Sequence, residues 1–223
     1  IARRPLAAPD GKTTPRPARR PRPVMAAKLQ NPRSIPMLTE RFDAALAYAR
    51  AAHATQTRKA TAIPYMSHLM AVSSLVLEAG GDEEQAIAGL LHDAIEDADA
   101  TETGLAAQFG ERVARIVAEC SDHHGGTEKA GWQTRKDAYL AGIATKSPDA
   151  VLVTTCDKLH NATAILEDLR AIGPTVFDRF TAGRDGTLWY YDGLAQALSA
   201  RMPGPLAGRL SRVVAELHAE ARG

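Results

Sequence analysis

The sequence predicts an all-α protein built as a bundle of about eight to ten helices. The 223 residues are 45% apolar but only 5% aromatic, and alanine and leucine far outnumber the β-branched residues that favour strands. Apolar side chains also recur at spacings of three and four, which is the period of an amphipathic helix. A chain of this length is expected to form one domain with a sizeable core.

The first 35 residues differ from the rest in composition. They hold nine Lys or Arg against the single acid Asp10, and they are rich in proline, as in PRPARRPRP at 15–23. Such a segment cannot bury enough apolar surface to offset the entropy of ordering it. We therefore predict a disordered basic tail over residues 1–35 and a folded domain over 36–223. That domain has 18 basic against 25 acidic residues and is net acidic.

The first two helices are predicted from capping and breaking residues. Thr39 is a suitable N-cap for a helix that continues through RFDAALAYARAAHA. A polar connection over 55–63 leads to a second helix, which we expect to open at Pro64 and to end near Glu78, before two glycines.

The third helix is expected to run unbroken through DEEQAIAGLLHDAIEDA after an N-cap at Asp82. Acidic residues fill its first turn, where the helix dipole favours them. Later helices are predicted at about 102–109, 110–123, 130–145, 149–171, 186–201 and 204–221.

Cysteine spacing and hydropathy exclude several classes of protein. Cys120 and Cys156 form no CxxC pair, which argues against a disulfide framework and a zinc knuckle. No apolar run approaches the roughly 20 residues that span a bilayer. We expect a cytoplasmic protein that binds a small molecule and no membrane. Nucleic acid is not expected as a partner, despite the basic tail.

The motif HDxxED carries the strongest chemical signal. On a continuous helix, His92 would stack with Glu96 and Asp93 with Asp97, since positions four apart share a face. The preceding AIAGLL is apolar and takes this cluster into the core. Carboxylates so close together in a low dielectric raise one another's pKa unless a cation neutralises them. The bland interpretation is a solvated helix face with ordinary surface acids.

Two further residues complete a candidate metal site. His68 lies in the second helix, and Asp157 directly follows an apolar run in a later helix. Helical bundles build metal sites from side chains on separate helices that converge in the core. With His92 and Asp93 they give two imidazoles and two carboxylates, a set that suits Mn²⁺, Fe²⁺ or Zn²⁺ better than Ca²⁺. Such an ion can activate water and a phosphoryl group, with Glu96 or Asp97 as the base.

The ordered strings RKATAIPYMSH, GLLHDAIED, FGERVARIV, WQTRKDAY, CDKLHNA and WYY resemble the HD hydrolase domain of the RelA/SpoT proteins, especially the single-domain small alarmone hydrolases. The resemblance covers roughly residues 38–200. It implies an HD-domain helical bundle that binds one Mn²⁺ and hydrolyses (p)ppGpp or (p)ppApp at the 3′ position, releasing pyrophosphate.

The resemblance also implies roles for particular residues. The metal ligands are His68, His92, Asp93 and Asp157, and the pair that manages the nucleophilic water is Glu96 and Asp97. The nucleotide contacts are Arg58, Lys59, Asn161 and Arg184. Arg135 and Lys136 supply positive charge for the pyrophosphate, or else are exposed positions of an amphipathic helix. No ligand role is assigned to His53, His123, His124 or His160.

The alternatives differ in substrate or in chemistry. The same ligands would serve an HD-type 5′-nucleotidase or a deoxynucleotide phosphohydrolase, and a non-catalytic sensor would bind the alarmone without turnover. The loop RKATAIPY lacks the glycine usual in the family, so guanine and adenine remain open as the base. A homo-oligomer and a functional pairing with a separate alarmone synthetase are both compatible with the resemblance.

Overall fold

The computed structural model of the chain describes residues 38–121 and 131–222. The predicted tail over 1–35, with His123 and His124, lies outside these residues. The described helices are α1 (Glu40–Ala52), α2 (Met66–Glu78), α3 (Glu83–Leu91), α4 (Ala94–Asp97), α5 (Glu102–Phe109), α6 (Glu111–Cys120), α7 (Trp132–Gly142), α8 (Pro148–Ile172), α9 (Gly183–Arg201) and α10 (Pro205–Glu220), with 3₁₀ turns η1 (Ile143–Thr145) and η2 (Gly173–Arg179). The described part of the chain contains no strand, so the all-α prediction is confirmed.

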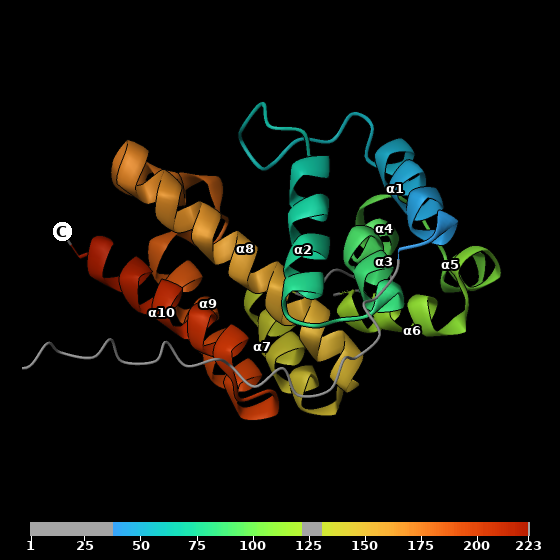
Figure 1. Cartoon of the computed structure of the whole chain (residues 1–223). Helices are drawn as coiled ribbons and strands as arrows, with labels where there is room; N and C mark the ends of the chain where they lie inside the picture. The colour runs from blue at the N-terminus through green and yellow to red at the C-terminus, as the bar shows by residue number, and fades with distance from the viewer. Residues whose placement is uncertain (1–37, 122–130, 223) are drawn as a thin grey trace, which may run out of the picture. The chain divides into compact units, whose positions relative to one another are not determined.

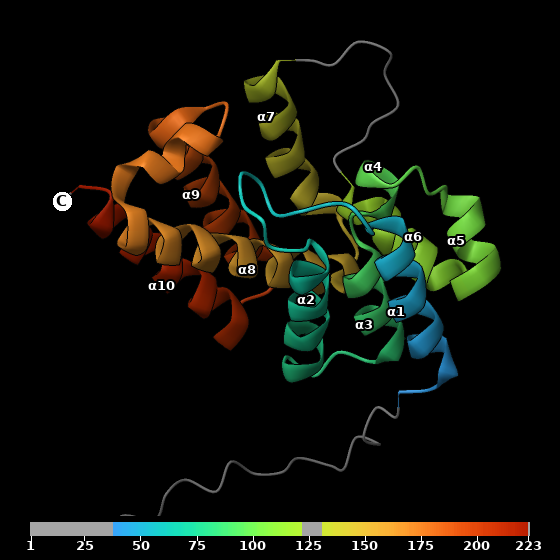
Figure 2. The ribbon, with the colours of Figure 1, turned by 90° about the horizontal axis from the view of Figure 1, so that it is seen from above.

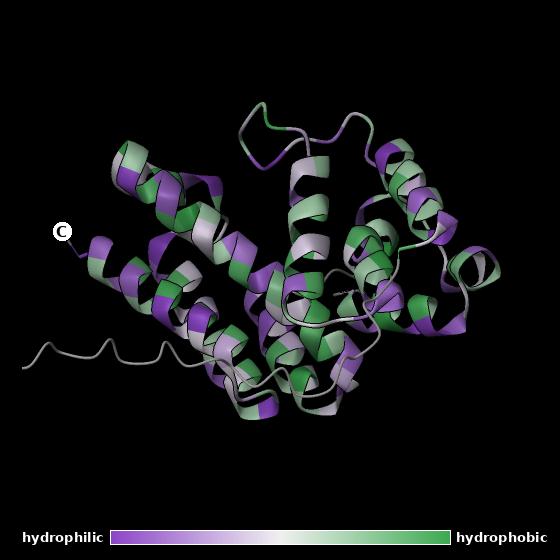
Figure 3. Cartoon of the chain, viewed as in Figure 1, coloured by the Kyte–Doolittle hydropathy of each residue, from purple (hydrophilic) through white to green (hydrophobic). Residues whose placement is uncertain are grey.

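The long helix α8 joins two groups of helices. It packs against α2, α3 and α6 on one side and against α9 and α10 on the other (Figure 1). Each group has its own apolar core, and the helices present hydrophobic faces to one another and hydrophilic faces outward (Figure 3). Although α8 has 25 residues, none of the described helices has the length and apolar content that a membrane span requires.

The helix starts follow the predicted capping chemistry. The hydroxyl of Thr39 accepts a hydrogen bond from the backbone N–H of Arg41 at the start of α1. Asp82 and Gln85 form a reciprocal capping box at the start of α3. Both predicted N-caps are confirmed, and Asp82 fixes the start of α3, the helix that leads into His92 and Asp93.

Helices α2 and α3 approach closely because a glycine lies between them. A Cβ atom on Gly89 would lie 3.1 Å from Cα of Ser73. The Ser73 hydroxyl also donates to the carbonyl oxygen of Ala86 at 2.9 Å. This contact brings His68 on α2 near the end of α3, where His92 lies.

The predicted third helix is wrong in one respect, because it is broken at the first two residues of HDxxED. Helix α3 ends at Leu91, and α4 begins at Ala94 after a turn at His92 and Asp93. The carbonyl oxygen of Gly89, which a continuous helix would offer to the N–H of Asp93, accepts a hydrogen bond from the His92 ring. The motif therefore does not form one continuous helical face.

Smaller differences occur at other helix ends. Helix α2 begins at Met66 rather than Pro64, because Pro64 pairs with Thr57 in an isolated bridge. Helix α9 begins three residues earlier than predicted, at Gly183, and the 3₁₀ turns of η2 had no counterpart in the prediction.

Candidate metal centre and adjoining cavity

Four predicted ligands come from three parts of the fold. His68 lies in the first turn of α2, His92 and Asp93 lie in the turn between α3 and α4, and Asp157 lies in the middle of α8. His68 and His92 are 0% and 3% exposed, and Asp157 is 6% exposed. Asp93 is half-buried. The structure brings all four together in the region where α2, α3 and α8 pack.

The distances between their donor atoms suit a single ion. Nε2 of His68 lies 3.3 Å from Oδ1 of Asp157, and Nε2 of His92 lies 3.1 Å from Oδ2 of Asp93. The two cross distances are 3.8 and 3.6 Å. Ligand atoms about 2.1 Å from a shared ion are separated by about 3 to 3.5 Å. The donor atoms of His68, His92 and Asp157 all lie within 4.8 Å of one another, and Asp93 joins them through its contacts with the two histidines.

The tautomer of His92 leaves Nε2 as a free electron pair. Its Nδ1 lies 2.9 Å from the carbonyl oxygen of Gly89, which can only accept, so Nδ1 carries the proton. Nδ1 of His68 lies 2.9 Å from Nδ1 of His160, and one of the two must donate. Nε2 of His68 and Nε2 of His92 are both buried, and neither has a hydrogen-bond partner among the described residues. This donor set fits a divalent cation, because the cation would satisfy both nitrogens.

Neighbouring side chains hold the two carboxylates. The Tyr65 hydroxyl donates to Oδ2 of Asp93 at 2.5 Å. Asn161 donates to Oδ1 of Asp157 at 2.6 Å, and the Lys158 ammonium lies 2.7 Å from Oδ2 of the same residue. Both carboxylates are therefore oriented by the protein itself.

The electrostatics of the cluster favour ionised carboxylates. Burial opposes the charge of Asp93, but His92 outweighs burial and holds the pKa of Asp93 at about 2. Burial likewise opposes a proton on His92, yet the two carboxylates raise the pKa of His92 above its ordinary value. For His68 burial dominates and lowers the pKa. The two carboxylates therefore favour a positive charge at this position.

Lys158 and His160 extend the cluster, the first as a cation and the second as a neutral group. Burial opposes the charge of Lys158, but Asp157 outweighs burial and raises the pKa of Lys158 well above its ordinary value. Burial, with the charges of His68 and Arg58, lowers the pKa of His160 to about 4. Near neutral pH, Lys158 is a fixed cation and His160 is a neutral partner of His68.

Glu96 and Asp97, the predicted water-managing pair, lie on the short helix α4 and are exposed. Oδ2 of Asp97 accepts a hydrogen bond from Nε2 of Gln56 at 2.8 Å. Gln56 belongs to the connection between α1 and α2, which crosses the end of α2 (Figure 2). Asp97 thus has a fixed partner outside its own helix.

A cavity of about 540 Å³ adjoins the cluster. Tyr65, Lys158 and Asn161 line it, and each contacts a predicted metal ligand. The charged side chains of its lining are Arg58, Lys59, Arg135, Lys136, Lys158, Arg179, Glu167 and Asp168. Within the described residues, this gives six basic against two acidic groups. Such a cavity is suited in size and charge to a phosphorylated small molecule.

The predicted nucleotide contacts divide into two sets. Five of them line the cavity, namely Arg58, Lys59, Arg135, Lys136 and Asn161. Arg184 does not: it is exposed and lies outside the cavity lining. Arg179 of η2 lines the cavity and pairs with Asp168.

Aromatic rings lie against three of the cavity's cations. Nζ of Lys158 lies 5.2 Å from the ring centre of Tyr139. Nζ of Lys59 lies 5.6 Å from the ring centre of Phe180, and Nζ of Lys136 lies 5.0 Å from that of Tyr190. These contacts hold flexible lysine side chains over apolar surfaces.

Several residues of the site were not predicted from the sequence. Lys158 follows Asp157 directly in DKLHN, and its position beside a ligand was the available sign. Tyr65 directly precedes α2, and its position three residues before His68 was the available sign. Arg179 and Phe180 lie in and just after a 3₁₀ segment that no periodicity marked.

Comparisons with known proteins agree with this geometry. The family described as HD domain matches residues 45–188. The Drosophila melanogaster protein named guanosine-3′,5′-bis(diphosphate) 3′-pyrophosphohydrolase MESH1 is 36% identical over 138 residues, which is 60% of this chain and 73% of that protein. An Aquifex aeolicus protein of the same enzyme name, without the suffix, is 34% identical over 126 residues, or 56% of this chain. The chain spans only 18% of the length of that relative.

A solved structure has a similar fold. It is described as a metazoan orthologue of SpoT that hydrolyses ppGpp and plays a role in starvation responses. It aligns with a TM-score of 0.66 and 29% identity, covering 79% of this chain and 95% of its own. The residues matched by the HD-domain family, 45–188, include all four side chains of the cluster described above.

Proposed function

The chain belongs to the HD-domain family, in the branch of the guanosine-3′,5′-bis(diphosphate) 3′-pyrophosphohydrolases, and on this premise we propose that it hydrolyses (p)ppGpp or (p)ppApp. The products would be pyrophosphate and the nucleoside with its 5′ phosphates, which is GDP or GTP for a guanine substrate. The observation that carries the proposal is a pair of buried imidazole nitrogens that face two carboxylates beside a basic cavity and have no hydrogen-bond partner within residues 38–121 and 131–222.

His68, His92, Asp93 and Asp157 would hold one divalent cation. Two imidazole nitrogens and two carboxylate oxygens suit Mn²⁺, with Fe²⁺ or Zn²⁺ as alternatives. The cation, when bound, supplies Lewis-acid activation of a phosphoryl oxygen and of water. Tyr65, Asn161 and Lys158 keep the carboxylates in place for it, since each contacts one of them.

Glu96 and Asp97 would handle the proton of the attacking water. In the reaction, the water oxygen adds to the phosphorus that is bonded to the 3′ oxygen. The bond between that phosphorus and the 3′ oxygen breaks, and the 3′ oxygen takes up a proton. A carboxylate within reach of the water can accept its proton and so act as general base. The two acids lie on α4, directly after Asp93 in the chain.

The basic cavity would bind the substrate's phosphates and base. Lys158 supplies a half-buried cation next to Asp157, and Arg135 and Lys136 add charge further along the lining. Arg58 and Lys59 would contact the purine and its sugar. A cytoplasmic location and a pairing with a separate alarmone synthetase would be consistent with this activity.

Incubation of the purified chain with a nucleotide panel tests the proposal. The panel holds ppGpp, ppApp, nucleoside monophosphates and deoxynucleoside triphosphates, with Mn²⁺ or after chelation, and products are separated by ion-exchange chromatography. We expect pyrophosphate from ppGpp or ppApp with Mn²⁺ and none after chelation. Orthophosphate from monophosphates, triphosphate from deoxynucleotides, or binding of ppGpp without turnover would each contradict it.

A further inference from the structure

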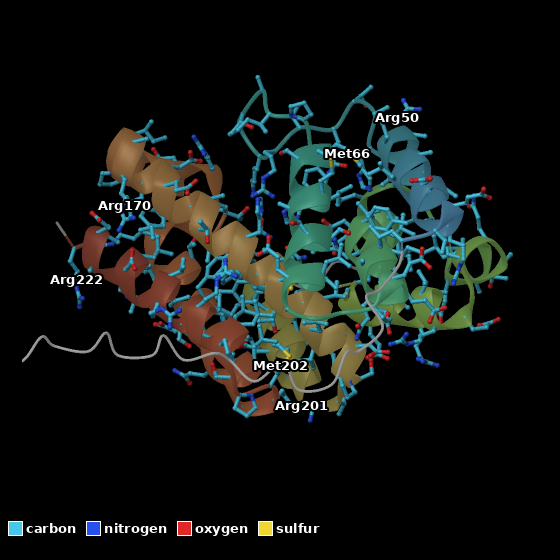
Figure 4. The ribbon with its side chains drawn as sticks, viewed as in Figure 1. Arg50, Met66, Arg170, Arg201, Met202 and Arg222 are labelled. Carbon is cyan, nitrogen blue, oxygen red and sulfur yellow. The ribbon has the colours of Figure 1, made fainter. Side chains whose placement is uncertain are left out.

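A chain of two hydrogen bonds connects the end of α1 to Asp97. His53, the C-cap of α1, is 4% exposed, and its Nδ1 lies 2.5 Å from Oε1 of Gln56. Nε2 of Gln56 then donates to Oδ2 of Asp97 at 2.8 Å. Arg50 near the end of α1 and Met66 at the start of α2 lie on the same side of the molecule (Figure 4), so the connection between these helices lies close to both.

The hydrogen-bonding capacities of the three groups fix the direction of the chain. The carboxylate of Asp97 only accepts, so the NH₂ of Gln56 must face it and the amide oxygen must face His53. Nδ1 of His53 must then carry the proton. Nε2 of His53, which is buried without a hydrogen-bond partner among the described residues, is left as an electron pair rather than as a stranded N–H donor.

The buried end of this chain is anchored by the same connection that holds Asp93. The His53 ring lies 5.4 Å from the ring of Tyr65, whose hydroxyl donates to Asp93. The backbone N–H of Tyr65 also donates to the carbonyl oxygen of Gln56 at 2.9 Å. One segment therefore orients a predicted metal ligand and a predicted water-managing acid together.

Asp97 has particular need of such an anchor. It is exposed and lies on a helix of only four residues. A carboxylate in that position exchanges among rotamers unless a partner selects one. The buried His53 ring holds the Gln56 side chain in place, and Gln56 in turn holds the Asp97 carboxylate.

We infer that His53 and Gln56 are positioning residues that hold the Asp97 carboxylate in one orientation beside the predicted metal ligands. Neither residue lines the cavity, so both act through Asp97. For its effect on turnover, the inference rests on the proposed function. The hydrogen-bonded link itself is independent of it.

Gln56→Met tests the effect on turnover, because methionine keeps the length of the side chain and removes both hydrogen bonds. We expect kcat for pyrophosphate release from ppGpp with Mn²⁺ to fall about 10- to 100-fold, as a misplaced reacting group costs rate. KM and the dissociation constant for Mn²⁺ should stay unchanged. The matched control is Thr55→Ala, an exposed neighbour in the same connection, which should keep the wild-type kcat.

Double variants separate positioning from general damage to the fold. Gln56→Met should add little to Asp97→Asn, and His53→Phe, which keeps an aromatic ring against Tyr65, should add little to Gln56→Met. Independent losses that multiply in the double variants, or a wild-type kcat for Gln56→Met, would overturn the inference.

An NMR measurement tests the link without any turnover. In the metal-free protein, the side-chain NH₂ resonances of Gln56, identified by their loss in Gln56→Met, should shift in both Asp97→Asn and His53→Phe and not in Thr55→Ala. Unchanged resonances would refute the link. If the wild type releases no pyrophosphate while these shifts occur, the proposed function fails and the positioning of Asp97 stands.

Discussion

At the scale of single residues, two buried imidazole nitrogens that have no hydrogen-bond partner in the described part of the chain have the clearest chemical consequence. Nε2 of His68 and Nε2 of His92 are buried and lie within 3.3 Å of a carboxylate oxygen each. A buried polar atom without a partner costs about 1 to 3 kcal/mol. A cation bound by both nitrogens and by Asp93 and Asp157 would remove that cost and balance the carboxylates' charge.

The role of Glu96 can be separated from metal binding. Glu96→Gln keeps the size of the side chain and removes its basicity, so we expect Mn²⁺ to bind with unchanged affinity. Turnover of ppGpp should fall by roughly 10²- to 10⁴-fold, the usual contribution of a general base. Steady-state kinetics measure the fall in turnover, and calorimetric titration measures the Mn²⁺ affinity. The exposed Glu102→Gln is the control, and wild-type turnover in Glu96→Gln would exclude Glu96 as the base.

The sequence predicted the residues of the cluster better than their partners. His92, Asp93 and Asp157 stood out because they follow apolar helical runs, and His68 because it lies in the second helix. The structure brings the four side chains together. Tyr65 and Lys158 act through contacts that depend on tertiary packing, and their positions close to predicted ligands in the sequence were the available local signs. Arg184 lies in the first turn of α9, outside the cavity lining, whereas Arg179 at the end of η2 lines the cavity.

At the scale of helices, the close packing of α2 on α3 positions both histidines. Helix positions were predicted well, because caps such as Thr39 and Asp82 are local. The break after Leu91 was not predicted, because it accompanies a hydrogen bond from the His92 ring to Gly89 that competes with the helical ladder. The break sets the direction of Asp93.

Gly89→Ala tests this helix contact. The added Cβ would lie 3.1 and 3.3 Å from backbone atoms of Ser73, so the helices must move apart. We expect a loss of about 1 to 3 kcal/mol in the free energy of unfolding and weaker Mn²⁺ binding. Thermal melting and Mn²⁺ titration measure both effects.

Gly142→Ala is the control for that substitution. Gly142 ends α7 with helical backbone angles, and a Cβ there meets nothing within 4 Å. Its stability should stay equal or rise slightly, since alanine is the better helix former. A Gly89→Ala protein as stable as this control would show that the α2–α3 contact is not tight.

At the scale of the whole molecule, one arginine ties together helices that are distant in sequence. Arg112 on α6 pairs with Asp82 and Glu84 at the start of α3 and with Asp149 at the start of α8, at 2.7 to 3.0 Å. The hydrogen bonds from Arg112 lower the pKa of Glu84 below 4.5 and of Asp149 below 3.8. Because α3 and α8 both carry predicted ligands, this cluster supports the site from the far ends of its helices.

Arg112→Met should therefore lower stability in a pH-dependent way. A carboxyl group whose folded pKa is depressed contributes stability above its unfolded pKa and loses it as the pH falls through the folded pKa. We expect a loss of about 1 kcal/mol at pH 7, given the partial exposure of these groups, and a shrinking difference from the wild type below about pH 4.5. Urea unfolding of both proteins from pH 7 to pH 3 measures this difference in the free energy of unfolding. Arg50→Met, at an exposed site on α1, should show no such trend, and a pH-independent loss in Arg112→Met would contradict the electrostatic explanation.

The most direct test of a single cation held by four side chains is a crystal structure of the Mn²⁺-loaded protein with anomalous data collected at the manganese edge. We expect one anomalous peak per chain, about 2.0 to 2.3 Å from Nε2 of His68, Nε2 of His92 and a carboxylate oxygen of both Asp93 and Asp157. A peak bound elsewhere, or full Mn²⁺ loading with no peak among these four side chains, would contradict the account.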